Sequence, residues 1–194
     1  MSTQLQAALS DQVKDLYSAE NQLIKALSKM AKASASDTLR EGFEKHLEET
    51  RGHAERVAQA AQMLEIKPGG KKCVAMMGLI EEGAEAIQDH GKGPLRDALL
   101  IAGAQRVEHY EIAAYGTARA MAERLGNSEL VSLFQQILDE EKATDAKLTE
   151  VSEGEVLPAA SQLEDDEGDQ RGGPRSRGRS GGSDGRKRTP GRSR

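Results

Sequence analysis

The sequence has no tryptophan, and its 194 residues include only three tyrosines and two phenylalanines. Runs of β-branched residues are also absent, which argues against β-strands. Alanine, leucine, glutamate, glutamine and lysine dominate instead, and these residues favour helices. The composition therefore predicts an all-α protein.

Cysteine is almost absent too. The single one, Cys73, excludes an internal disulfide framework and favours a reducing compartment. The N-terminus lacks the basic start and apolar run of a secretory signal peptide. No stretch approaches the roughly 20 apolar residues of a membrane helix. We therefore expect a soluble, cytoplasmic protein with no membrane partner.

Charge is distributed unevenly along the chain. Residues 171–194 contain nine basic residues and one acid, a net charge of +8, whereas the preceding 170 contain 18 bases and 31 acids, a net charge of −13. Gly154 and Pro158 end the last helical pattern. Together with the charge difference they predict a folded domain over residues 1–152 and a tail over residues 153–194 that is first acidic, then rich in Arg, Gly and Ser. Such a tail cannot bury a core and is expected to be disordered.

The basic part of the tail has two interpretations. It is either a solvated extension or an electrostatic contact for nucleic acid, and it has no aromatic residue with which to stack on bases. The residues expected to contact phosphates are Arg175, Arg177, Arg179, Arg186, Lys187 and Arg188.

Apolar residues recur every three or four positions in four long segments, approximately 4–33, 37–66, 94–125 and 128–151. A helix of that length spans roughly 40 Å. The connection between the second and third segments is long and contains a shorter helical pattern, approximately 73–89. This order predicts a ferritin-like four-helix bundle with a short extra helix in the crossover.

Glutamates interrupt the apolar stripes of three of these segments. They are Glu20 in the first, Glu108 and Glu111 in the third, and Glu141 in the fourth. A carboxylate is rarely buried without a partner, and these stripes contain no Lys or Arg. A salt bridge to a neighbouring helix would explain one such position, but four together favour a bound cation.

The second segment has two histidines on its apolar face, His46 and His53, with Glu49 between them. Each is either an imidazole ligand or a hydrogen-bonded core histidine. Glu49 follows Glu20 by 29 residues and Glu141 follows Glu111 by 30, which suggests two matched hairpins around a pseudo-twofold site. By contrast, Glu140 is expected to face water.

Two-metal bundles use a Glu from each of two helices and a Glu–His pair from each of the other two. The sequence therefore predicts two metal ions per chain, with iron, manganese or zinc as candidates. The predicted ligands are Glu20, Glu49, His53, Glu108, Glu111, Glu141 and Asp145, with His46 as the alternative imidazole.

Several short motifs resemble those of the ferritin-like bacterial stress proteins called YciF-type. They are Asp15–Glu20, His46–Thr50, Gly78–Glu82, and Val107–Ala113 with Tyr115–Thr117. The resemblance covers about residues 3–152 and implies a di-metal bundle, often dimeric, that acts in stress response. The pair Glu108-x-x-Glu111 also resembles the third helix of rubrerythrins, which are peroxide-reducing di-iron proteins. The chain departs from the wider pattern because the second ligand follows Glu49 and Glu141 at four residues, and an aspartate stands where histidine is usual.

Two functions are consistent with these patterns. The first is a di-metal protein that reacts with peroxide or oxygen or oxidises Fe²⁺, with no catalytic residue assigned. The second is a stress-protective helical homodimer that binds nucleic acid through its basic tail.

Overall fold

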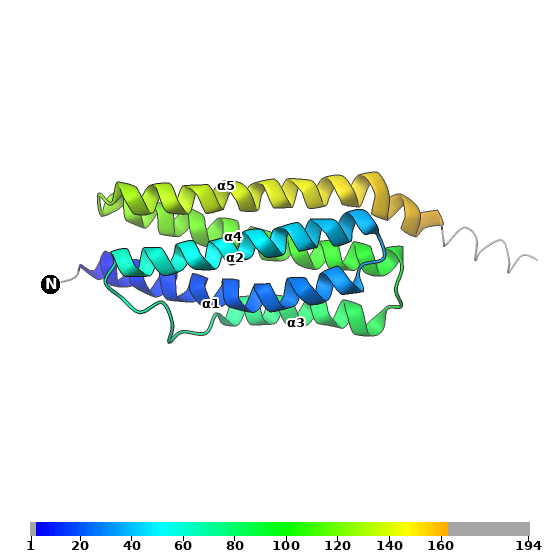
Figure 1. Ribbon diagram of the computed structural model, residues 1–194, viewed down its shortest axis with the longest axis horizontal. Helices are drawn as coiled ribbons and strands as arrows, with labels where there is room; N and C mark the ends of the chain where they lie inside the picture. The colour runs from blue at the N-terminus through cyan, green and yellow to red at the C-terminus, as the bar shows by residue number, and fades with distance from the viewer. Residues whose placement is uncertain (1–2, 163–194) are drawn as a thin grey trace, which may run out of the picture.

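The computed structural model describes residues 3–162, so the tail residues predicted to contact nucleic acid lie outside the described part. The elements are α1 (Gln4–Ala33), α2 (Asp37–Met63), α3 (Val74–Asp89), α4 (Pro94–Arg124), α5 (Ser128–Val151) and the π-helical turn η1 (Ser152–Val156). Helices α1, α2, α4 and α5 form the bundle, and α3 lies against it in the crossover (Figure 1). Between residues 3 and 162 there is no strand, so the all-α prediction is confirmed.

The helix ends follow local sequence signals. Thr3, Ser36 and Asn127 each accept a hydrogen bond, at 3.0–3.1 Å, from the backbone N–H three residues later, which starts α1, α2 and α5. Pro94 occupies the first turn of α4, where its missing N–H costs nothing. Gly126, with a φ of 72°, follows the end of that helix.

The predicted apolar stripes form the interior of the bundle. Buried side chains gather in two clusters, one around Leu27 and Ile101 and the other around Leu9 and Phe134. On α1, Leu16 belongs to one cluster and Leu23 to the other, and Glu20 lies between them. The bundle therefore has a polar layer between two apolar halves.

Helical structure continues past the predicted domain boundary at residue 152. The turn η1 widens the helix, and helical residues then extend to 162 through Pro158. The wider π turn keeps Val151 and Val156 on one face, and both are buried against the core. The Ser36 hydroxyl also donates to Glu155 Oε1 at 2.5 Å. Burial of apolar residues thus extends the helix where Gly154 and Pro158 predict an end.

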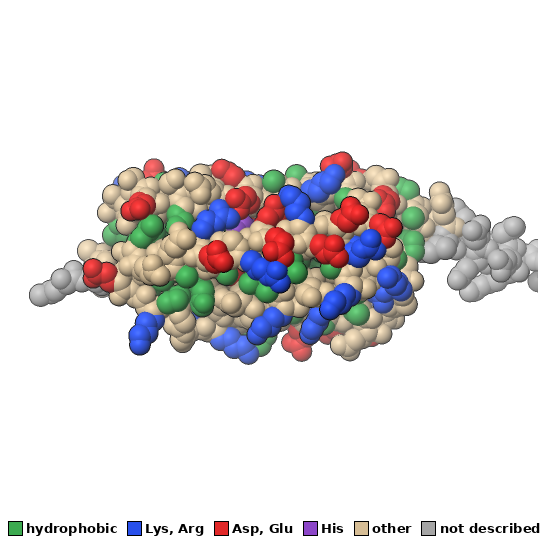
Figure 2. Space-filling model, viewed as in Figure 1, with side chains coloured by type: hydrophobic (Ala, Val, Ile, Leu, Met, Phe, Trp, Pro, Cys, Tyr) green, Lys and Arg blue, Asp and Glu red, His purple; other side chains and the backbone are tan. Residues whose placement is uncertain are grey.

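The outer surface is charged with both signs. Figure 2 shows acidic and basic side chains interspersed over the face formed by α1, α2 and α5. None of the helices between residues 3 and 162 is long and apolar enough to cross a membrane.

Candidate metal centre

Six ionisable side chains meet in the polar layer of the bundle. Each of the four long helices contributes at least one of them, and none is more than 3% exposed. They are Glu20 from α1, His46 and His53 from α2, Glu108 and Glu111 from α4, and Glu141 from α5.

The six side chains form two groups that share one member. One group is His46, Glu108, Glu111 and Glu141, and the other is Glu20, His53 and Glu141. In each group one ligand atom per residue lies within 4.8 Å of all the others. Ligands on opposite sides of a first-row metal ion are separated by about 4 Å, twice the metal–ligand distance. Each group therefore has the size of one metal site, and Glu141 lies where it can bridge two ions.

The buried polar atoms that lack a hydrogen-bond partner are concentrated in these two groups. Among the described residues nine such side-chain atoms are found, and eight belong to the six clustered residues. Both oxygens of Glu111 and both of Glu141 are included. A buried polar atom without a partner is costly, and folded proteins rarely retain one. Their convergence on one small volume is the observation expected of a site that holds cations.

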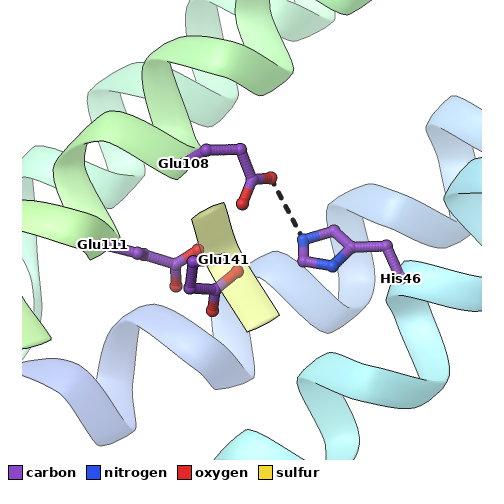
Figure 3. A group of neighbouring side chains, drawn as sticks. All are labelled: His46, Glu108, Glu111 and Glu141. Atoms are coloured by element: carbon purple, nitrogen blue, oxygen red, sulfur yellow. Dashed lines mark ion pairs between the residues drawn. The ribbon is translucent and has the colours of Figure 1, made fainter. Parts of the chain in front are cut away.

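The imidazoles approach the carboxylates closely but without hydrogen-bond alignment. His46 Nε2 lies 3.1 Å from Glu108 Oε1, and His53 Nδ1 lies 2.8 Å from Glu141 Oε1. Both nitrogens nevertheless lack a properly oriented hydrogen-bond partner. Figure 3 shows the His46 ring from α2 turned towards Glu108, with the carboxylates of Glu111 and Glu141 beside each other. The lone pairs of these atoms are thus available to a common centre.

The electrostatics of the metal-free cluster are unfavourable for four ionised carboxylates. Burial, reinforced by the Glu141 carboxylate, raises the pKa of Glu20 from 4.5 to about 7. Burial and the carboxylates of Glu20, Glu141 and Glu108 raise the pKa of Glu111 well above its usual range. Each pKa is raised because a buried negative charge is unfavourable, so the neutral carboxyl is preferred. Two divalent cations would neutralise four carboxylates.

The pKa values of the two imidazoles are also raised. Burial by itself would lower the pKa of His46, but the carboxylates of Glu108, Glu49 and Glu141 together outweigh burial and raise the pKa well above 6.5. The pKa of His53 is raised in the same way, against burial, chiefly by Glu141. No Lys or Arg within residues 3–162 forms an ion pair with Glu20, Glu108, Glu111 or Glu141. The alternative of a salt bridge to Lys or Arg on a neighbouring helix therefore does not explain these glutamates.

Two further side chains hold the cluster in place. One of them, Tyr115, lies one turn from a carboxylate in the sequence, a position that allows either a hydrogen bond to a ligand or plain packing. The Tyr115 hydroxyl donates a hydrogen bond to Glu20 Oε1, although its position in the stripe favours plain packing. Glu140, expected to face water, accepts from Arg56 and lies 2.8 Å from His53 Nε2. The Glu140 side chain is 40% exposed, so it faces water in part as expected, but from its place beside the stripe on α5 it also reaches α2 across the helix interface. Hydrogen bonds of this kind orient metal ligands.

Glu49 and Asp145 lie outside both groups of ligand atoms. Glu49 is 28% exposed in its side chain, pairs with Lys45 at 2.8 Å and lies 3.8 Å from His46 Nδ1. Asp145 is 24% exposed in its side chain and pairs with His109, at 3.4 Å, on the outer surface. The structure therefore brings together five of the seven predicted ligands and adds His46.

The site is not twofold symmetric in the way the repeated spacing suggests. Glu49 and Glu141 occupy matched positions of the two hairpins, yet only Glu141 points into the centre. His53 and Asp145 are also matched, and only His53 points inward. Helix α2 thus offers two imidazoles, one to each group, and α5 offers the shared carboxylate.

Comparison with known proteins identifies the family and the fold of the chain. Residues 4–161 match the family described as "Domain of unknown function (DUF892)". Protein YciF of Escherichia coli (strain K12) is 50% identical over 139 residues, which cover 71% of this chain and 84% of YciF. The solved structure of that stress protein has a TM-score of 0.74 at 47% identity, over 78% of this chain and 96% of the other.

Two further solved structures are similar. YcfI from Rhodopseudomonas palustris has a TM-score of 0.73 at 41% identity, over 76% of this chain and 94% of the other. A ferritin-like, diiron-carboxylate protein from Bacillus anthracis str. Ames has a TM-score of 0.62 over 78% of this chain and 99% of the other. At 16% identity, that likeness shows a shared fold alone. By its sequence match and its bundle, the chain belongs to the DUF892 family of YciF-type, ferritin-like proteins.

Proposed function

We propose that this protein binds two divalent metal ions per chain, iron or manganese, and uses them to react with peroxide or oxygen, or to oxidise Fe²⁺, during stress. The observation that supports this most directly is the set of eight unpartnered polar atoms on six converging side chains. The fold shared with a diiron-carboxylate protein and the name of the E. coli stress protein are consistent with the proposal. A cytoplasmic location and a homodimer remain predictions.

In this proposal the ligands are divided between two sites. His46, Glu108 and Glu111 would hold one ion, Glu20 and His53 would hold the other, and Glu141, which belongs to both groups, would serve both. Tyr115 holds the Glu20 carboxylate in its orientation, and Glu140 holds the His53 ring. Metal ions at such a site supply redox equivalents and a Lewis acid in a water-poor environment. The side chains of the chain fix the coordination and keep bulk water away.

Metal stoichiometry tests the proposal. Metal-free protein is incubated with Fe²⁺ under anaerobic conditions or with Mn²⁺, desalted, and analysed for bound metal. We expect two ions per chain for the wild type, one for Glu20→Gln or Glu108→Gln, and none for Glu141→Gln, because Glu141 belongs to both groups. Glu123→Gln is the control, since that side chain is 63% exposed and pairs with Arg119. Full occupancy in Glu141→Gln would show that the bridging assignment is wrong.

Turnover is tested separately. The metal-loaded wild type should oxidise Fe²⁺ with hydrogen peroxide or oxygen faster than buffer does, and faster than Glu141→Gln. Equal rates for the two proteins, despite metal binding by the wild type, would leave a structural role for the metal.

A second candidate function is supported by the charge of the chain. The basic segment from residue 171 onwards, at +8, suits electrostatic contact with nucleic acid, and YcfI is called a candidate structural protein. In this alternative a helical homodimer protects nucleic acid, and the metal ions only stabilise the fold.

A further inference from the structure

A cavity of about 160 Å³ lies between α2 and α5, on the outside of the candidate metal centre. Its walls combine apolar side chains with charged ones. They are Thr38, Leu39, Gly42, Phe43, Lys45, His46 and Glu49 on α2, and Glu140, Ala143, Thr144, Lys147, Leu148 and Val151 on α5.

His46 separates this cavity from the metal centre. Its Nε2 faces Glu108 at 3.1 Å, on the inner side. Its Nδ1 faces Thr144 Oγ1 at 3.5 Å and Glu49 Oε2 at 3.8 Å, and both of those residues line the cavity. The two nitrogens of one ring therefore face the two compartments.

Three other hollows on the described surface do not reach the centre. One lies between α1 and α3 beside Met30 and Ile80, another beside Cys73 and Tyr110, and a third along α4 beside Met121. None of these three has a clustered ligand on its walls. On the α2–α5 seam itself, the approach to His53 is covered by Glu140, which is held by the Arg56 guanidinium.

Glu49 occupies the inner part of the cavity wall. Its carboxylate is partly exposed, so it can meet an ion from solvent, and it lies beside the His46 ring. Its partner is Lys45, whose side chain is 78% exposed. Water screens such an exposed ion pair, so the pair contributes little stability. A carboxylate in this position can exchange the Lys45 ammonium for a divalent cation without moving its backbone.

We propose that the α2–α5 cavity is the entrance to the metal centre and that Glu49 is a transit ligand, which binds an incoming divalent cation before His46 and Glu108 take it. The inference rests on the proposed function, because it requires a centre that holds metal. It gives Glu49 a role different from that of a permanent ligand. Gly42 lines the cavity and is exposed, and an added Cβ there would meet no atom within 4 Å.

The rate of metal uptake tests this entrance. Metal-free full-length protein is mixed with Co²⁺ in a stopped-flow instrument, and binding is followed by the visible absorbance of the bound ion. Glu49→Gln should slow uptake about tenfold, because an anionic site that attracts the cation is lost. Gly42→Leu should slow uptake by a similar factor, because the added side chain would narrow the opening from a position where its Cβ meets no atom within 4 Å. Both variants should still bind two Co²⁺ per chain at equilibrium.

Two matched substitutions serve as controls. Glu48→Gln removes a neighbouring carboxylate that is 68% exposed and pairs with Arg51. Gly78→Leu adds the same side chain on α3, at a glycine that also has no atom within 4 Å. Both control variants should take up Co²⁺ at the wild-type rate.

The outcomes separate the entrance from the metal centre itself. If Glu49→Gln and Gly42→Leu took up Co²⁺ at the wild-type rate, the proposed entrance would be wrong, whereas the proposed metal centre would be unaffected. Loss of one equilibrium Co²⁺ in Glu49→Gln would make Glu49 a permanent ligand and overturn its transit role. Failure of the wild type to bind Co²⁺, Fe²⁺ or Mn²⁺ would overturn the proposed function, and the entrance with it.

Discussion

Glu111 is fully buried on α4, and neither of its carboxylate oxygens has a hydrogen-bond partner. Three other buried carboxylates, those of Glu20, Glu141 and Glu108, raise its pKa further than burial does by itself. In the metal-free protein this residue opposes folding whenever it is ionised. In the metal-bound protein the same residue is a ligand, so its net effect depends on the cation.

Replacing this residue should therefore have opposite effects in the two states. We expect Glu111→Gln to raise the free energy of unfolding of the metal-free protein by about 1–3 kcal/mol, because a buried charge is removed. With Fe²⁺ or Mn²⁺ present, the variant should be less stable than the wild type. Thermal melts with metal and with chelator measure both effects. A variant that is destabilised equally in both states would show that Glu111 only packs.

The pKa of Glu20 gives a pH dependence with a definite sign. Because its folded pKa, about 7, lies above the ordinary 4.5, the neutral form stabilises the fold below pH 4.5, and this stabilisation is lost as pH rises through 7. The shift corresponds to on the order of 3 kcal/mol. His46 and His53, whose pKa values are also raised, act in the same direction.

Metal-free protein should accordingly melt at a higher temperature at pH 5.5 than at pH 8. Metal-loaded protein should show the reverse, since protons compete with the cation for the same ligands. Calorimetry at both pH values, with and without Mn²⁺, measures how the melting temperature of each form changes with pH. A metal-free protein that is more stable at pH 8 would contradict the assignment of Glu20 as a buried, raised-pKa carboxylate.

At the scale of the helices, the start of α4 secures the turn between α1 and α2. Asp97 is 1% exposed and accepts hydrogen bonds from the backbone N–H groups of Ala35, at 2.8 Å, and Ser36, at 2.7 Å. The adjacent Arg96 donates to the Ala33 carbonyl at 2.6 Å. These contacts join the two hairpins of the bundle at one end, so the ligands of α1 and α2 are held relative to those of α4.

Removing this contact should weaken the bundle without removing a ligand. Asp97→Ala should lower the free energy of unfolding by about 1–3 kcal/mol, because the two N–H groups lose their acceptor. Asp139→Ala, on the exposed face of α5, is the control and should cost far less. Urea unfolding measures the difference. Equal midpoints for the two variants would show that water replaces Asp97 at the turn.

At the scale of the whole molecule, the strongest feature is the separation of charge. The first 170 residues carry −13 and the last 24 carry +8. The described residues 3–162 contain 18 bases and 26 acids, a net charge of −8 that repels nucleic acid, so a contact with phosphates would have to be made by the basic segment. The segment has no aromatic residue, and its binding should therefore be sequence-independent and steeply salt-dependent.

Full-length protein should thus shift short DNA or RNA duplexes at low salt, and much less at physiological salt. A chain that ends at Gln170 should bind neither. Replacement of Arg175, Arg177, Arg179, Arg186, Lys187 and Arg188 by glutamine should weaken binding while the length of the chain is kept. A dimer with two such segments should bind more tightly than a monomer. Equal binding by the full-length and shortened chains would exclude the basic segment as the contact.

Much of the bundle could be predicted from the sequence, since helical periodicity records which face of a helix is buried. The stripe of α1 predicted Leu16, Glu20 and Leu23 as inward positions, and all three are buried. The same rule identified Glu108, Glu111 and Glu141. The presence of carboxylates inside a bundle of four helices was therefore determined by the order of residues along each helix.

Only the tertiary structure decided which polar side chains converge. Glu49 and Asp145 lie near their stripes, yet both turn to the surface, where Lys45 and His109 provide partners. Glu140 lies adjacent to its stripe, yet it reaches His53 on another helix. Periodicity defines the angle of a residue about its own helix axis. The contacts at the edge of a stripe depend instead on how far neighbouring helices are shifted along their axes and on the rotamer that the packing allows.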